Sequence, residues 1–69
     1  MGMYVGLTSN PEQRKTGHGN PSDWKLYGPF QTETQARNWE KQTLANGFQG
    51  GTGGKGWLYG YTYTITLST

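Results

Sequence analysis

Apolar and polar residues alternate in three segments of the chain, and a two-residue period of this kind is typical of β-strands. The segments are residues 3–8, 24–28 and 57–67. The last segment is the longest and the most apolar, so we expect it to lie at the centre of a sheet. Pro29 directly follows the second segment, which predicts a strand end or an edge position there.

The alternation divides the first and last segments into two distinct faces. In residues 3–8, the apolar Met3, Val5 and Leu7 share one face, and the other face carries Tyr4, Gly6 and Thr8. In residues 57–67, one face carries only large side chains, whereas the other consists of Leu58, glycine and threonines. The large side chains are Trp57, Tyr59, Tyr61, Tyr63, Ile65 and Leu67.

The segment that follows the first strand predicts a short helix over residues 11–16. Asn10 is suited to cap it, Pro11 suits the first helical position, and Gly17 is a natural end. A helix of fewer than two turns is unstable in isolation, so we expect packing against the rest of the chain to hold it.

A longer helix is predicted from Glu33 to Asn46, with Gly47 as its C-terminal cap. Thr32 and Gln35 have the spacing of a capping box. One face of this helix is apolar apart from a single carboxylate, Glu40. That face comprises Ala36, Trp39, Glu40, Thr43 and Leu44, and the opposite side carries Glu33, Arg37 and Lys41.

The order of elements is therefore strand, helix, strand, helix, strand. We expect a single small α+β domain over residues 1–69, with a three-stranded antiparallel sheet, two helices and the C-terminal strand central. Residues 47–56 contain six glycines in ten positions and predict a mobile or tightly turning loop.

Composition limits how so small a chain is stabilised and what it does. The 69 residues include no cysteine and only one histidine, which argues against disulfides and structural zinc, and aromatic residues make up 14%. The net charge of +2 is compatible with nucleic-acid binding but is too small to indicate it. No apolar run is long enough for a membrane span, so no membrane partner is expected. The absence of a signal-peptide pattern and of cysteine predicts an intracellular location.

Several familiar motifs can be found in the sequence, but the order of the predicted elements or the spacing of the residues argues against each. Residues 51–56 match the dinucleotide fingerprint G-x-G-x-x-G, but they follow a helix and open a strand, which is the reverse of the order that the fingerprint needs. A triad assembled from Ser9 or Ser22 with His18 and Asp23 has no spacing that favours it. The same holds for glycosidase-type carboxylate pairs.

One ordered set of chemically active residues remains. The triplet Tyr4-Val5-Gly6 lies on the first strand, and Arg14 lies on the short helix after it. His18 follows that helix, and Glu40 lies on the otherwise apolar face of the long helix. A carboxylate on a buried face is costly unless it is paired or used, so Glu40 is the most informative member.

This set resembles the GIY-YIG endonuclease domain. The triplet at residues 4–6 is similar to the family's Y-[IV]-G strand, and residues 7–14 are similar to the run that leads into its arginine helix. His18 matches a histidine frequent in the family, and residues 34–41 are similar to the helix that carries the metal-binding glutamate. The resemblance covers roughly residues 3–46.

The chain departs from the family at its beginning. The family opens with a central strand that carries a G-[IL]-Y motif, but only two residues precede the first strand here. The C-terminal strand, with Leu58-Tyr59-Gly60 and the tyrosines that follow, offers a substitute. The resemblance then implies a circular permutation, in which Tyr61 or Tyr63 replaces the tyrosine of the missing strand.

The resemblance implies a metal-dependent endonuclease that hydrolyses phosphodiester bonds in DNA. A tyrosine (Tyr4, Tyr61 or Tyr63), with His18 nearby, would activate the nucleophile, and Arg14 would bind the phosphate. Glu40 would hold one Mg²⁺ or Mn²⁺, an ion that keeps much of its hydration shell. The residues expected to contact the nucleic acid are Lys15, Lys25, Arg37 and Lys55.

The same residues can also be interpreted as structural, with no role in catalysis. Arg37 could pair with Glu40, Arg14 could pair with Glu12 or Asp23, and His18 could be an ordinary loop residue. The alternative function is a binding module for a protein or for single-stranded nucleic acid, or a small structural or regulatory homodimer. A binding module would use Trp24, Trp39, Trp57 or the tyrosine row.

Overall fold

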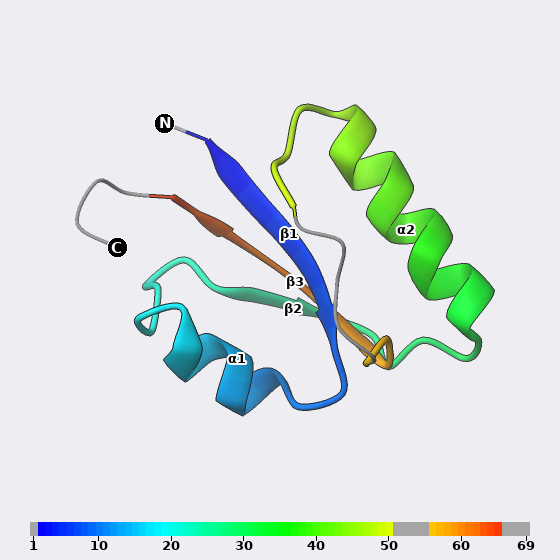
Figure 1. Ribbon diagram of the computed structural model, residues 1–69, viewed down its shortest axis with the longest axis horizontal. Helices are drawn as coiled ribbons and strands as arrows, with labels where there is room; N and C mark the ends of the chain where they lie inside the picture. The colour runs from blue at the N-terminus through cyan, green and yellow to red at the C-terminus, as the bar shows by residue number, and fades with distance from the viewer. Residues whose placement is uncertain (1, 51–55, 66–69) are drawn as a thin grey trace.

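Three antiparallel strands and two helices make up the fold (Figure 1). A computed structural model describes residues 2–50 and 56–65 of the chain. In chain order the elements are β1 (Met3–Thr8), α1 (Pro11–Gly17), β2 (Lys25–Tyr27), α2 (Glu33–Ala45) and β3 (Tyr59–Thr64). The α+β class and the order of elements agree with the sequence prediction.

The strand order in the sheet is β1-β3-β2, so the C-terminal strand is central, as predicted. β1 pairs with β3 along its whole length, with Tyr4 opposite Tyr63 and Gly6 opposite Tyr61. β2 pairs with β3 over three residues. Residues that oppose each other in an antiparallel sheet face the same side, so the large tyrosines of β3 share a face with Tyr4.

β2 and β3 are shorter than their alternating patterns predict. At the start of β2, the carboxylate of Asp23 accepts hydrogen bonds from the backbone N–H and the hydroxyl of Thr64, in the place of further backbone pairing. At its end, Pro29 has no N–H to offer, and Phe30 donates instead to the carbonyl of Leu58. The last two residues of the predicted strand, 66 and 67, lie outside the described residues.

Local capping places both helices where the sequence predicts them. The Asn10 side chain accepts a hydrogen bond from the N–H of Gln13 at the start of α1, at 3.2 Å. At the start of α2, the Thr32 hydroxyl accepts from the N–H of Gln35 at 3.1 Å. The Gln35 side chain in turn accepts from the N–H of Gln31, the residue before Thr32, rather than from Thr32 as in the predicted capping box.

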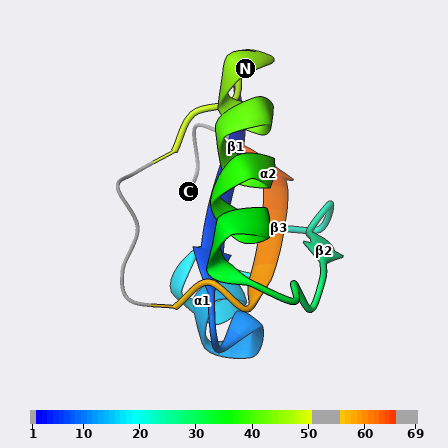
Figure 2. The ribbon, with the colours of Figure 1, turned by 90° about the vertical axis from the view of Figure 1, so that its right-hand side faces the viewer.

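The helices cover opposite faces of the sheet (Figures 1 and 2). On the α2 side the core is aliphatic, with Val5, Leu7 and Ala36 buried. Trp39 also lies on this side, against Gly60 of β3, where a side chain would overlap the indole ring. Neither helix in the described part of the chain is long and apolar enough to cross a membrane.

The beginning of the glycine-rich segment is fixed against the sheet. The N–H of Gln49 donates to the carbonyl of Met3 at 2.7 Å, and the carbonyl of Gln49 accepts from the N–H of Val5 at 2.8 Å. Gln49 thereby forms a parallel bridge with Tyr4 at the outer edge of β1. Within the predicted loop of residues 47–56, Gln49 is therefore held to the sheet by its backbone, and residues 51–55 lie outside the described residues.

We predict that Gly60→Ala destabilises the protein by about 1–3 kcal/mol, because the added methyl group would force the Trp39 ring out of its place. Urea unfolding monitored by tryptophan fluorescence measures the effect. Gly17→Ala is the matched control, since a Cβ at Gly17 meets nothing within 4 Å. Equal stability of the two variants would contradict the close packing of Trp39 on β3.

Candidate functional site

Four aromatic side chains surround His18 on the α1 side of the sheet. The centroid of the His18 ring lies 5.3 Å from that of Tyr4, 5.6 Å from Tyr61, 4.9 Å from Tyr63 and 6.5 Å from Trp24. The tyrosines lie on β1 and β3. Trp24 directly precedes β2 and stacks on Tyr61, with 4.5 Å between the ring centroids. We call these five residues the aromatic cluster.

Both ring nitrogens of His18 lie at hydrogen-bonding distance from tyrosine hydroxyls. Nδ1 lies 2.7 Å from the Tyr63 hydroxyl oxygen, and Nε2 lies 3.2 Å from that of Tyr61. A neutral imidazole has one N–H and one bare nitrogen, so one tyrosine donates to the ring and the other accepts from it. The two hydroxyls and the imidazole therefore form a continuous path for a proton.

Burial in the cluster, and then the positive charge of Arg14, lower the pKa of His18 below its ordinary value of 6.5. The imidazole is accordingly neutral at pH 7 and available as a base. His18 is thus surrounded by aromatic rings and lies at hydrogen-bonding distance from two hydroxyls, an environment that an ordinary loop histidine lacks.

Tyr61 reaches the cluster because its partner in the sheet has no side chain. Gly6 lies opposite Tyr61, and a Cβ at Gly6 would overlap the hydroxyl end of the Tyr61 ring. Tyr61 is buried, and burial is the main reason that its pKa rises to about 12. Smaller electrostatic effects follow: Tyr4 raises this pKa, Arg14 lowers it, and Tyr63 and then Glu40 raise it.

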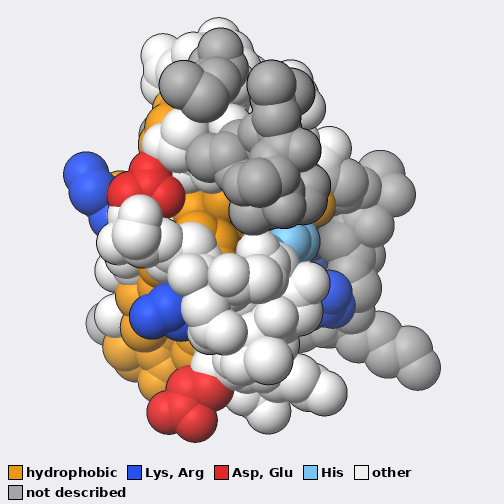
Figure 3. All heavy atoms as spheres, turned by 90° about the vertical axis from the view of Figure 1, so that its left-hand side faces the viewer, with side chains coloured by type: hydrophobic (Ala, Val, Ile, Leu, Met, Phe, Trp, Pro, Cys, Tyr) orange, Lys and Arg blue, Asp and Glu red, His pale blue; other side chains and the backbone are white. Residues whose placement is uncertain are grey.

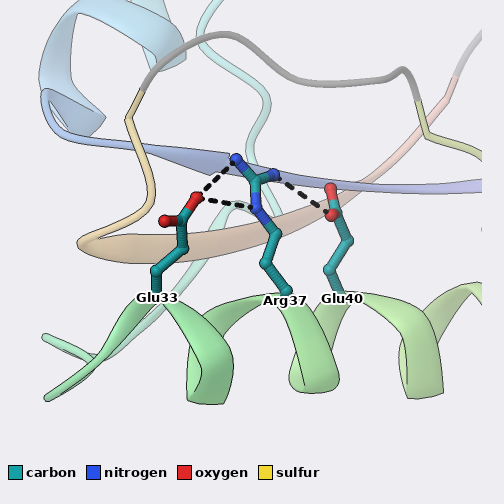
Figure 4. Close-up of polar contacts among 3 residues, drawn as sticks. All are labelled: Glu33, Arg37 and Glu40. Atoms are coloured by element: carbon teal, nitrogen blue, oxygen red, sulfur yellow. Dashed lines mark hydrogen bonds and ion pairs between the residues drawn. The ribbon is translucent and has the colours of Figure 1, made fainter.

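Glu40 projects from α2 toward β1 together with Glu33 and Arg37 (Figure 4). One of its oxygens, Oε1, lies 3.6 Å from Nη1 of Arg37, and Arg37 also pairs with Glu33 at 3.3 Å. The Glu40 side chain is only 12% exposed, and its Oε2 is buried with no hydrogen-bond partner among the described residues. Residues three apart are neighbours on a helix, so the expectation that Arg37 lies on the side opposite Glu40 is wrong. The alternative in which Arg37 pairs with Glu40 is confirmed.

The remaining charged residues predicted for the site are solvated or tied elsewhere. Arg14 and Lys15 lie exposed in the last turn of α1, and Lys25 is exposed on β2. The salt bridges within the described residues all involve Arg37, and Asp23 is engaged by Thr64 rather than by Arg14. Lys55, predicted to contact nucleic acid, lies outside the described residues.

A pocket of about 630 Å³ opens beside the cluster. It is lined by Tyr4, His18, Tyr63, Gln49, Ile65 and two glycines, Gly17 and Gly19. In Figure 3 the histidine, in pale blue, reaches the surface on this side of the molecule.

Of the residues around His18, Trp24 is expected from the sequence only as a contact of the alternative binding module, and Gln49 is not expected at all. The signal for Trp24 is present, because alternation places it on the same sheet face as Tyr63 once the last strand is central. Gln49 carries no comparable signal, since it reaches the site through backbone hydrogen bonds that any residue can make.

The described residues contain no group of three or more histidine and acidic side chains that could together hold a metal ion. A metal site here would therefore depend on Glu40 with water as the other ligands.

Comparison with known proteins returns no relative for this chain. No protein family model matches it, and the searches of curated proteins and of solved structures found no match.

We predict that acidification weakens the fold through His18. Since the His18 pKa is lower in the folded chain than in the unfolded chain, protonation favours unfolding, and stability falls as the pH decreases through and below 6.5. Urea unfolding at about pH 7.5 and about pH 5 measures the loss. His18→Gln should show a smaller loss over the same range, and an identical loss would mean that other groups cause it.

Proposed function

We propose that this protein is a metal-dependent DNA endonuclease of the GIY-YIG type, reduced in size and circularly permuted. The observation that carries the proposal is the gathering of Tyr4, His18, Tyr61 and Tyr63 in one hydrogen-bonded aromatic cluster. Arg14 from α1 and, to the least extent, Glu40 from α2 on the opposite face of the sheet shift the pKa of Tyr61, the first lowering it and the second raising it. These are the residue types and elements that the resemblance implies.

The position of β3 supports the permutation. In the family the strand that opens the domain is central, and here the central strand is the last one. β3 pairs antiparallel with the strand that carries Tyr4 and Gly6, and it brings Tyr61 against that glycine. A tyrosine from the C-terminal strand thus lies where the proposal needs one.

The proton path through His18 suggests how the nucleophile would be activated. Tyr61, with a pKa of about 12, is protonated at neutral pH and is not a phenolate base. It can take a proton from an attacking water only as it passes its own proton to a neighbour. Neutral His18, 3.2 Å from the Tyr61 hydroxyl, is that neighbour, and its lowered pKa keeps it unprotonated and ready to accept.

Arg14 is suited to hold the phosphate. Its guanidinium is exposed on the last turn of α1 and can bind two phosphate oxygens at once. Its positive charge, which acts on both His18 and Tyr61, would also favour the negative charge that develops at the phosphate during attack.

Glu40 fits the role of a single-carboxylate ligand for Mg²⁺ or Mn²⁺. Arg37 occupies its Oε1, but Oε2 is a buried hard oxygen without a partner among the described residues. Mg²⁺ commonly binds through one or two carboxylates and keeps several waters. When bound, such an ion would neutralise the charge that develops on the leaving oxygen.

The test is nicking of supercoiled plasmid by the purified protein with and without Mg²⁺ or Mn²⁺. We expect metal-dependent nicking that falls by about 100-fold or more in Glu40→Gln and in Arg14→Ala, since each removes a charge from the reacting phosphate. Glu33→Gln is the matched control, because Glu33 also pairs with Arg37 from the same helix but is exposed.

Nicking that survives both Glu40→Gln and Arg14→Ala would point to a contaminating nuclease and defeat the proposal. Equal losses in Glu33→Gln and Glu40→Gln would show that the ion pairs of Arg37, rather than a metal at Glu40, are what matters.

A second candidate is a binding module without catalysis, and the Arg37–Glu40 ion pair favours it. A carboxylate neutralised by a neighbouring guanidinium already has a structural role. Leu26, Tyr27 and Leu58 are large apolar side chains with substantial exposure, and they offer a contact surface for a protein partner or a second copy. A shift of DNA mobility without cleavage, or a dimer in solution, would support this candidate over the endonuclease.

A further inference from the structure

We propose that the pocket beside His18 binds an unstacked nucleobase of the DNA substrate. The inference rests on the proposed function and specifies its substrate. DNA with an unpaired or displaced nucleotide at the cleavage site would be preferred over a continuous duplex.

The chemistry of the pocket suits an uncharged, flat heterocycle. No charged side chain lines it, and the lowered pKa of His18 leaves that ring neutral at pH 7. A phosphate would find no cation there. The walls instead offer the half-buried ring of Tyr4, the aliphatic side chain of Ile65 and the amide of Gln49. Aromatic faces bind bases by stacking, and amides and hydroxyls bind their edges.

The size of the pocket is consistent with such a ligand. Its volume of about 630 Å³ lies within the range of clefts that hold small organic ligands. An inorganic ion or a single phosphate would leave most of this space empty.

The position of the pocket relates it to the proposed reaction. Tyr63, on the Nδ1 side of His18, lines the pocket, whereas Tyr61, on the Nε2 side, does not. His18, which lines the pocket, therefore lies between the hydroxyls of Tyr61 and Tyr63. A base held in the pocket would belong to a nucleotide at or next to the bond that Tyr61 and Arg14 address.

A base within a continuous duplex cannot enter this pocket, because both of its faces are stacked on neighbouring base pairs. It must first leave the stack, and the energy required is smallest for a nucleotide that is already unpaired. The pocket would therefore select among DNA structures rather than among sequences.

The first experiment measures binding by fluorescence anisotropy in EDTA, which prevents cleavage. Three labelled DNAs are compared: a duplex, the same duplex with one bulged nucleotide, and that bulge with an abasic site in place of the nucleotide. We expect the bulged duplex to bind about tenfold more tightly than either of the others, a difference within the range of base–aromatic stacking. Equal affinity for the bulge and the abasic bulge would overturn the proposal.

The second experiment adds bulk at the wall of the pocket without changing a residue of the cluster. Gly17 lines the pocket, and a Cβ there meets nothing within 4 Å, so Gly17→Leu adds an apolar side chain at the pocket wall without a clash. We expect this variant to bind the bulge no better than the abasic bulge. Gln13→Leu, at an exposed position on the same helix, is the matched control and should keep the tenfold preference.

The result separates the two proposals because binding is measured without metal. A bulge preference that depends on Gly17 in a protein that nicks no plasmid would retain the base pocket and defeat the endonuclease. Metal-dependent nicking without any bulge preference would retain the endonuclease and defeat the pocket. A loss of affinity in Gly17→Leu that is equal for all three DNAs would also defeat it.

Discussion

The aromatic side of this molecule depends on the absence of a side chain at Gly6. Because Gly6 lies opposite Tyr61 in the sheet, the Tyr61 ring can lie across β1 and bring its hydroxyl to His18. Trp24 then stacks on the ring at 4.5 Å. A methyl group at this one position would displace Tyr61 and with it both the stacking and the proton path. The glycine of the Tyr4-Val5-Gly6 triplet is thus needed for the packing of the last strand.

The two faces of the sheet meet different physical demands. The α2 face buries Val5, Leu7 and Ala36, which need no hydrogen bonds. The α1 face buries tyrosines, and a buried hydroxyl without a partner is costly. One imidazole meets this demand for two of them, Tyr61 and Tyr63. In a chain of 69 residues with no disulfide, the same cluster therefore serves both stability and the proposed chemistry.

The sequence predicts the bounds of helices and strands that local interactions define. It does not predict bounds that depend on contacts with residues far away in the chain. β1 is predicted with its bounds because its alternation is uninterrupted, and α2 is predicted to within one residue because Thr32 caps it. The predicted length of β2 is too great, because the strand begins only after Asp23, whose side chain accepts a hydrogen bond from Thr64 at the end of β3. In the site, alternation predicts the sheet face of Tyr61, and the family resemblance singles out Tyr61 and His18. The bridge from Gln49 is made by the backbone alone and leaves no trace in the sequence.

The bridge from Gln49 also affects how copies of the chain meet one another. A sheet edge with free N–H and C=O groups invites pairing with another chain, and natural proteins protect such edges. Gln49 occupies part of the outer edge of β1, and the opposite edge is β2, only three residues long and bearing Lys25. The sheet therefore offers a second copy little backbone to pair with, which discourages edge-to-edge aggregation of so small a protein.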